Sequence, residues 1–313
     1  MGNAISQIYP PKPVFAVEQI PDLAGQIVIV TGGNAGALLS KNAKVYLAAR
    51  SRPRAEEAIE WLKNETGKEA IFLELDLASF NSIKKATEEF KSKEQELHVL
   101  YNNAGVMAPP VELKTAEGYD LQFGTNVLGH FYFTKLLLPA LLHTAKNSPL
   151  AHGHARIINT SSSAVYIGPR GHIVWDTLGT SEDSDARRKR MGTNVLYAQS
   201  KIGNVLFSNE LAKQYGDQGI ISVSLNPGNL KTELGRHLTR LHIWLLEFIL
   251  YPASYGALTQ LWAGTTPDIE QLNGKFLIPW ARIGDAGAFA RDEQLAKKLW
   301  NWCEEQVKGH STM

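Results

Sequence analysis

The stretch TGGNAGALLSKNAKVYLAAR, residues 31–50, has the beginning and the end of a nucleotide-binding βαβ unit. It follows the apolar run QIVIVT at 26–31, and its own last residues form a second apolar run. Glycines directly after a buried strand let backbone N–H groups approach a pyrophosphate, which makes Gly32, Asn34 and Gly36 candidate phosphate-binding positions. A glycine turn alone is weak evidence, because such turns also follow strands for purely structural reasons.

The segment between this glycine loop and the second strand is short. Only residues 37–43 remain to return along a six-residue strand, a span of about 20 Å. As a helix they would cover about 10 Å, and fully extended they would just reach. We therefore expect the first crossover helix to be shortened or lost, with no helix N-terminus directed at a pyrophosphate.

Strand-like apolar runs alternate with helical periodicity along the rest of the chain. Strands are predicted at 26–31, 44–49, 70–76, 97–102, 155–161, 220–226 and 275–279, and helices at roughly 53–64, 81–92, 119–144, 196–215 and 292–307. Continuous apolar strands separated by helices indicate a parallel sheet covered on both faces. The predicted fold class is therefore α/β, a doubly wound parallel sheet of Rossmann type. Residues 1–23 are predicted to be an N-terminal arm, and 24–313 a single domain.

Composition excludes several classes of protein. Lys and Arg number 32 against 31 Asp and Glu, so no overall charge favours nucleic acid or an anionic membrane. Cys303 is the single cysteine, which excludes an internal disulfide framework and predicts a cytoplasmic, reducing location. His152 and His154 lie in a polar loop without nearby acidic or cysteine partners, so a metal site has little support. The run IWLLEFILY at 243–251 is too short to span a bilayer.

Two short motifs have competing interpretations. Gly2 and Ser6 match the acceptor pattern for myristoylation, but a chance match in an unpacked arm is favoured, and one acyl chain would bind membrane only weakly. RRKR at 187–190 could be a nuclear signal, but a solvated loop face is favoured.

Polar residues at the predicted strand ends carry the chemistry, because ligands of such folds bind beyond the carboxyl ends of the strands. Arg50 ends the second strand, where an acidic residue would bind a ribose diol and a guanidinium can pair with a 2′-phosphate. We therefore predict NADP(H) in preference to NAD(H); the alternative is a surface arginine beside Ser51. Tyr197 and Lys201 lie four apart on one helix face, and a nearby ammonium would lower the tyrosine pKa. Alone, such a pair is more often a packing Tyr and a surface Lys.

The motifs TGGNAG (31–36), NNAG (102–105), TNVLG (125–129), NTSSS (159–163), YAQSK (197–201) and NPGNLKT (226–232) occur in this order. Together, over roughly residues 24–308, they resemble the short-chain dehydrogenase/reductase family. The resemblance is closest to fungal members similar to retinol dehydrogenases and the WW-domain-containing oxidoreductase. It implies that Tyr197 is the acid/base, Ser162 orients the carbonyl, Lys201 holds the ribose and Asn126 anchors a water relay. Physics alone would not exclude Ser161 or Ser163 in place of Ser162.

The same resemblance implies a set of cofactor-binding residues. Asp76 and Leu77 would lie at the adenine. The others are Gly32, Asn34, Gly36, Arg50, Asn103, Ala104, Gly105, Tyr197, Lys201, Pro227, Gly228, Leu230 and Thr232. The chain departs from the family pattern after Gly36, where about seven residues of the first helix are missing. A long interval between Ser162 and Tyr197, with the run at 243–251, suggests an apolar substrate lid or a packed surface helix.

Two functions remain. One is an NADP-dependent oxidoreductase that transfers a hydride between nicotinamide and a carbonyl or alcohol of a lipophilic small molecule. The other is an impaired family member with a damaged cofactor loop, a splice product or a faulty gene model, acting at most as a binding protein. A Ser-His hydrolase is excluded because the chain has no G-x-S-x-G elbow.

Overall fold

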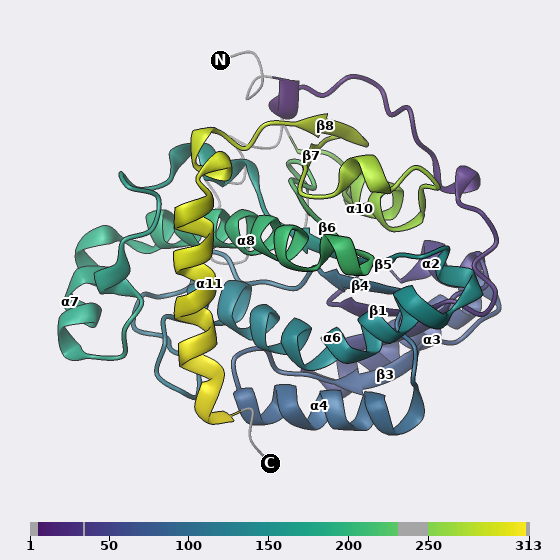
Figure 1. Ribbon diagram of the computed structural model, residues 1–313, viewed down its shortest axis with the longest axis horizontal. Coiled ribbons are helices and arrows are strands. Elements are labelled where there is room, and N and C mark those ends of the chain that lie inside the picture. The colour runs from purple at the N-terminus through teal and green to yellow at the C-terminus, as the bar shows by residue number, and fades with distance from the viewer. Residues whose placement is uncertain (1–5, 34, 231–249, 311–313) are drawn as a thin grey trace.

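The computed structural model describes residues 6–33, 35–230 and 250–310. In this part of the chain, eight strands form one sheet in the order β3-β2-β1-β4-β5-β6-β7-β8 (Figure 1). Neighbouring strands run parallel except β8, which is antiparallel to β7. The strands are β1 Ile27–Thr31, β2 Lys44–Ala49, β3 Ile71–Glu74, β4 Val99–Asn102, β5 Ala155–Thr160, β6 Ile220–Leu225, β7 Phe276–Ile278 and β8 Arg282–Gly284. The predicted Rossmann-type α/β class is confirmed.

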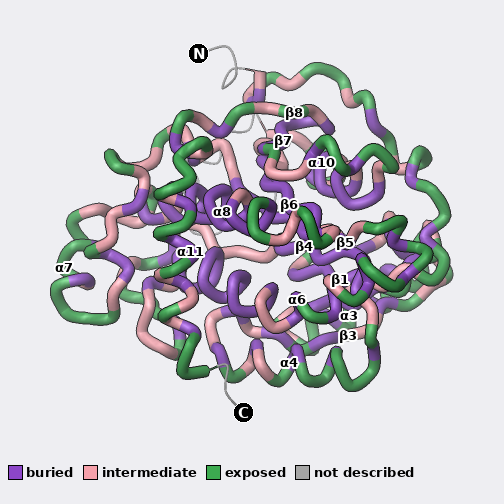
Figure 2. The backbone as a smooth tube through the Cα atoms, in the orientation of Figure 1, coloured by how far each residue is buried: buried purple, intermediate pink, exposed green. Residues whose placement is uncertain are grey.

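Helices cover both faces of the sheet (Figure 1). The described helices are α2 Gly36–Ser40, α3 Arg52–Thr66, α4 Phe80–Lys93, α5 Leu121–Phe123, α6 His130–Asn147, α7 Glu182–Met191, α8 Thr193–Tyr215, α10 Ala253–Thr265 and α11 Glu293–Val307. One apolar core joins the sheet to α4, α6, α8 and α11, and a second joins it to α2, α3 and α10. Figure 2 shows the central strands and α8 as the most continuously buried parts.

The helix boundaries follow from local chemistry. Ser79 precedes α4, and its hydroxyl accepts a hydrogen bond from the Ser82 N–H. Asp292 accepts from the Leu295 N–H in the same way before α11. Helix α3 has Pro53 in its first turn and ends at Gly67, whose φ of 68° is left-handed.

The crossover between β1 and β2 consists of residues 32–43 and contains α2. Helix α2 rises about 7.5 Å over its five residues, against about 17 Å for β1. The residues on either side of α2 cover the rest of the return, and Leu38 and Leu39 are buried in the second core. The crossover therefore keeps a short helix, and the expectation that no helix N-terminus is directed at a pyrophosphate stays a prediction. The connection also leaves the strand pairing undistorted, with Ile27 opposite Lys44 and Thr31 opposite Ala48.

The N-terminal arm is packed where it is described. Phe15, Ile20 and Leu23 are buried in the second core, so an unpacked arm is wrong for residues 6–23. In Figure 1 the arm passes from beside β8 to the start of β1. Gly2 lies outside the described residues, and the division into an arm and a single domain at 24–313 stays a prediction.

The basic run at 187–190 is part of α7 and is not a uniformly solvated loop face. The Arg188 side chain is fully buried, and its Nη1 donates to the carbonyls of Thr177 and Gly179 at 2.8 Å each. Its other guanidinium nitrogen pairs with Asp185. Arg188 therefore holds α7 against the loop before it, whereas its basic neighbours are exposed. No described helix is long and apolar enough to cross a membrane.

Candidate functional site

The polar motifs meet at the carboxyl ends of four adjacent strands. Strands β1, β4, β5 and β6 are neighbours in the sheet (Figure 1). Asn102 pairs with Asn159, and Thr160 pairs with Leu225, so these strand ends lie level with one another. The segments that follow the strands therefore converge on one edge, as ligand sites of doubly wound sheets require.

Thr31 connects the glycine loop to the loop after β4. Its hydroxyl accepts hydrogen bonds from the N–H groups of Asn103 and Ala104, both at 2.9 Å. Asn103 Nδ2 also donates to the Thr31 carbonyl at 3.0 Å. Gly32 has a φ of 90°, and a Cβ there would lie 3.1 Å from Asn103 Nδ2, so glycine is required by both conformation and space. Sequence reasoning missed Thr31, although its position directly before the glycine turn was a signal.

Asn126 is held in a π-helical turn, Gly124–Gly129, between α5 and α6. Its Nδ2 donates to the Val106 carbonyl and to Ser200 Oγ, both at 3.0 Å, and its Oδ1 accepts from the Val106 N–H. A Cβ at Gly105 would lie 3.0 Å from Asn126 Oδ1 and 3.6 Å from Lys201 Nζ. The loop after β4 therefore closes on both residues. Single π-turns inside helices often mark functional sites.

His130 links Asn126 to the glycine loop and was also missed. Its Nδ1 lies 3.1 Å from the Asn126 carbonyl oxygen and its Nε2 lies 3.1 Å from Thr31 Oγ1. Burial lowers the pKa of His130 to about 4, so the ring is neutral at physiological pH. Because a carbonyl only accepts, Nδ1 carries the proton, and Nε2 is an acceptor that shares the Thr31 hydroxyl proton with the Tyr101 carbonyl, 3.2 Å from Thr31 Oγ1. Its position four residues after Asn126 on one helical face was the available signal.

The three consecutive serines have different surroundings. Ser161 is buried, and its hydroxyl donates to the Lys201 carbonyl at 2.7 Å. Ser162 Oγ accepts a hydrogen bond from the Ala164 N–H at 3.1 Å, and the Ser162 side chain lies near enough to Tyr197 to lower its pKa. Ser163 begins the 3₁₀ turn Ser163–Ile167. Of the three, Ser162 is the serine that acts on the pKa of Tyr197.

Lys201 is 4% exposed, and its Nζ donates to the Thr160 carbonyl at 3.1 Å. Burial lowers the pKa of this ammonium group to about 8. No other acceptor in the described part of the chain contacts it, which leaves two N–H groups available. Nζ lies 5.7 Å from the centre of the Tyr197 ring.

The expected lowering of the Tyr197 pKa by Lys201 is not observed. Burial raises the pKa of Tyr197, and the nearby Ser162 side chain offsets only part of this increase. A buried phenolate is disfavoured unless a charge reaches its oxygen, and Lys201 instead faces the ring and the Thr160 carbonyl. Tyr197 is therefore held as a neutral phenol.

Arg50, Asp76 and Leu77 follow the two outer strands β2 and β3. Arg50 is exposed and, among the described residues, has no hydrogen-bond or ion-pair partner. The nearby Arg52 differs, because it lies within 3.6 Å of both Glu56 and Glu74. Asp76 Oδ1 accepts from the Ala78 N–H at 3.0 Å. Leu77 is buried. A Cβ at Gly129 would lie 2.3 Å from the Leu77 carbonyl oxygen, so only glycine fits at position 129.

The turn after β6 is fixed from several sides. Asn226 Oδ1 accepts from the Gly228 N–H at 3.0 Å. Gly228 has a φ of 95°, and a Cβ there would lie 2.8 Å from the Trp280 ring. Leu230 pairs with Tyr251, so the chain returns to this turn. Pro227, Gly228 and Leu230 thus lie at the carboxyl edge. Asn34, Thr232 and residues 243–249 of the apolar run lie outside the described residues, and the apolar lid stays a prediction.

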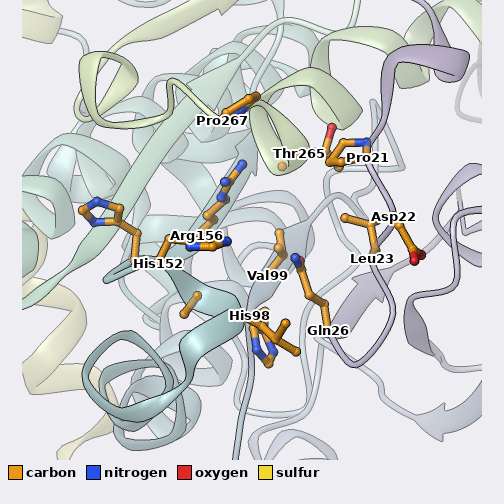
Figure 3. A pocket seen from close by; sticks show the side chains of 14 residues that line it. Pro21, Asp22, Leu23, Gln26, His98, Val99, His152, Arg156, Thr265 and Pro267 are labelled. Atoms are coloured by element: carbon orange, nitrogen blue, oxygen red, sulfur yellow. The ribbon is translucent and has the colours of Figure 1, made fainter.

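A cavity of about 230 Å³ lies away from this edge (Figure 3). It is lined by Val99 and Arg156, which lie at the starts of β4 and β5, and by Thr265 at the end of α10. The starts and ends of parallel strands lie on opposite edges of a sheet, so this cavity does not serve Tyr197.

Comparison with known proteins identifies the family. A short-chain dehydrogenase/reductase of Armillaria gallica is 55% identical over 320 aligned positions, covering 99% of this chain and 100% of that protein. The chain belongs to the short-chain dehydrogenase/reductase family. The family model for short chain dehydrogenases matches residues 26–175. Another short-chain dehydrogenase/reductase, from Phomopsis amygdali, is 44% identical, covering 98% of this chain and 97% of that protein.

Solved structures share the fold of this short-chain dehydrogenase/reductase at low sequence identity. RhlG of Pseudomonas aeruginosa, described as an NADP active-site complex, has a TM-score of 0.63 and 22% identity, covering 82% of this chain and 95% of that one. A 3-ketoacyl-(acyl-carrier-protein) reductase from Brucella melitensis, complexed with NADH, has a TM-score of 0.60 and 21% identity, covering 82% and 96%. At this identity they show the fold alone.

The Armillaria gallica relative has residues that this short-chain dehydrogenase/reductase lacks. The alignment has 320 positions and covers 99% of the 313 residues of this chain, about 310, so about ten positions face a gap here.

Proposed function

We propose that this chain is an NADP-dependent oxidoreductase that interconverts a carbonyl and an alcohol on an apolar small molecule. The observation that carries the proposal is the convergence of Asn126, Ser162, Tyr197 and Lys201 on one edge of the sheet, with Ser162 beside Tyr197 and the buried Lys201 facing the Tyr197 ring. The resemblance to retinol dehydrogenases is part of this proposal.

The residues present fit a nicotinamide dinucleotide at its two ends. The two available N–H groups of Lys201 are the buried donors that ribose hydroxyls would satisfy. Arg50 is the unpaired cation that a 2′-phosphate would pair with. Between these ends, Gly32 allows the pyrophosphate to come close to the backbone N–H groups. When bound, the nicotinamide supplies the hydride.

The side chains supply the proton and the orientation. Tyr197 donates its phenolic proton to the substrate oxygen during reduction and takes it back during oxidation. Ser162 donates a hydrogen bond to the same oxygen. The raised pKa of Tyr197 keeps the proton in place at neutral pH, which suits reduction of a carbonyl. Lys201 faces the ring of Tyr197, and Asn126 bonds to Val106 in the loop after β4, so both residues keep their partners in place.

Apolar surface beside Ser162 supports an apolar substrate. Ile167, four residues after the serines, is 72% exposed. The rings of Tyr251 and Tyr255 pack edge-on against Trp280, with ring centres 5.3 and 5.2 Å away, and this cluster borders the Gly228 turn. Exposed apolar groups at a polar site favour a ligand that covers them.

Tyr197→Phe tests the chemistry. We expect turnover of an apolar ketone with NADPH to fall by about a hundredfold or more, because only the transferable proton is lost. NADPH binding, measured by fluorescence titration, should be unchanged. Tyr215→Phe on the same helix is the matched control and should keep full activity. Equal rates for Tyr197→Phe and the original chain would remove Tyr197 from the mechanism.

A second candidate is an impaired family member that binds cofactor too weakly to turn over. The five-residue α2, which is shorter than the family pattern implies, favours it. Titration of the chain with NADPH separates the two candidates. Low micromolar binding supports the enzyme, and the absence of binding at millimolar NADPH supports the impaired protein.

A further inference from the structure

Gln7 lies in the N-terminal arm, far in sequence from every motif of the site, yet it is only 1% exposed. Its Oε1 accepts a hydrogen bond from Asn226 Nδ2 at 2.9 Å, and its Nε2 donates to the Tyr166 hydroxyl at 2.7 Å. Asn226 begins the turn after β6, and Tyr166 lies in the 3₁₀ turn that follows Ser162. One arm residue therefore bridges two loops of the candidate site.

The bridge is part of a directed chain of hydrogen bonds. The Gly228 N–H donates to Asn226 Oδ1, which leaves Asn226 Nδ2 as the donor to Gln7. Gln7 Oε1 is thus the acceptor and Nε2 the donor to Tyr166. The Tyr166 hydroxyl in turn donates to the Asp285 carbonyl at 2.5 Å. Every amide orientation in the chain is set by its neighbour, so the four bonds form or break together.

The arm is held at this place by its own contacts. Arg282 on β8 donates from Nη2 to the Ser6 carbonyl at 2.9 Å. Farther along the arm, Phe15 and Ile20 are buried in the core. Figure 1 shows the start of the arm beside β8. Loss of Gln7 would remove the acceptor of the buried Asn226 Nδ2, and an unsatisfied buried donor costs more than an exposed one.

We infer that Gln7 is a positioning residue of the active site. It fixes the Asn226–Gly228 turn and the loop after Ser162 relative to each other. The inference rests on the proposed function, and it takes the turn after β6 to border the nicotinamide end of the cofactor. Gln7 acts through Asn226 and Tyr166, and the arm is a required part of the site.

Hydrogen–deuterium exchange tests the bridge without any turnover. In Gln7→Met, which keeps the volume and removes both hydrogen bonds, we expect exchange at residues 226–230 and 163–167 to become about tenfold faster. Lys12→Ala, an exposed position of the same arm, should change neither segment. Tyr166→Phe is the second variant, and it should speed exchange at 226–230 although Tyr166 does not bond to that turn. Unchanged exchange at 226–230 in both variants would overturn the inference.

Ligand binding distinguishes positioning from general destabilisation. Gln7→Met should weaken NADPH binding about tenfold and leave the binding of adenosine 2′,5′-bisphosphate unchanged, because Gln7 supports only the nicotinamide end. Equal weakening of both ligands would overturn the positioning role. If the unmodified chain binds neither ligand, the proposed function fails, and the exchange of the 226–230 segment still decides whether Gln7 holds it.

Discussion

The buried ammonium group of Lys201 makes the folded protein less stable than an apolar side chain would. Burial lowers its pKa from 10.5 to about 8, which corresponds to roughly 3 kcal/mol of desolvation cost at neutral pH. The single hydrogen bond to Thr160 offsets about 1 kcal/mol of this. A group that lowers stability at a strand end is typical of a functional site.

Lys201→Met should therefore stabilise the cofactor-free protein while abolishing turnover. Below pH 8 the ammonium is charged in both folded and unfolded chains, so the original protein bears the full cost. Between pH 8 and 10.5 only the unfolded chain keeps the proton, and the cost disappears. We expect a melting temperature higher by a few degrees at pH 7, a gain of about 2 kcal/mol, that shrinks toward pH 10.5. Lys213→Met, exposed on the same helix, is the control; a gain independent of pH would contradict the assignment.

Alanine at each of the three serines should give three different results. Ser162→Ala should lower kcat/KM about a hundredfold at unchanged stability, because one donor to the substrate oxygen is lost. Ser161→Ala should lose about 1 kcal/mol of stability, since its hydroxyl bonds to the Lys201 carbonyl. Ser163→Ala should change neither. Steady-state kinetics and thermal unfolding of the three variants measure this. If Ser163→Ala is as impaired in turnover as Ser162→Ala, the assignment of the carbonyl-orienting role to Ser162 is wrong.

The elements that sequence predicted best are those with unambiguous periodicity. Strand β2 occupies residues 44–49 as predicted, and α11 differs from its prediction by one residue. Helix α10 was missed because its residues 253–265 are apolar on all sides and include two glycines, so no amphipathic stripe appears. Strand β8 has three residues and pairs antiparallel, which no local pattern announces. Helix α7 was hidden by its charged sequence.

The site residues divide in the same way. Tyr197, Lys201 and Ser162 belong to local sequence motifs. They could be predicted to lie near one another because the carboxyl ends of parallel strands meet at one edge of the sheet. Thr31 and His130 act through contacts between elements, and Gln7 bonds to a residue 219 positions away. Position in the chain could mark Thr31 and His130 as candidates, but the partners of all three residues depend on packing of the complete fold and could not be predicted from local patterns.

The junction between β2 and α3 contains two arginines with opposite surroundings. Arg50 has no partner in the described chain, whereas Arg52 contacts Glu56 and Glu74. We expect Arg50→Ala to weaken NADPH binding at least tenfold and to leave NADH binding unchanged, because only the 2′-phosphate is lost as a partner. Arg52→Ala should change neither affinity. Isothermal titration of both cofactors checks this, and equal affinities of the original chain for NADPH and NADH would refute it.

At the scale of the whole molecule, one crossover lies between the two parts of the proposed cofactor site. The proposed adenosine side, with Arg50 and Asp76, and the side of Tyr197 and Lys201 lie at the same carboxyl edge. The connection between β1 and β2 is closed and packed through Leu38 and Leu39. Its five-residue helix is the part that would face the pyrophosphate. The fold therefore tolerates the short crossover, and the consequence falls on ligand binding.

Lengthening this crossover should restore cofactor affinity. The insertion after Gly36 adds Ile-Gly and five further helix-forming residues, which lengthens α2 by about two turns. A longer helix adds about 0.3–1 kcal/mol from its dipole, and each hydrogen bond to a charged phosphate oxygen adds about 1.5–3 kcal/mol. Two or three such bonds correspond to a several-hundred-fold gain in NADPH affinity or more. We expect affinity, thermal stability and turnover to rise together.

A seven-residue Gly/Ser insertion at the same place is the matched control, because it lengthens the crossover without favouring a helix. We expect it to leave NADPH affinity as weak as in the original chain and to lower stability. Equal gains from both insertions would mean that length, and not the helix N-terminus, limits binding. Low micromolar NADPH binding by the original chain, unaffected by the seven-residue helical insertion, would mean that the glycine turn and the five-residue α2 already suffice for the pyrophosphate.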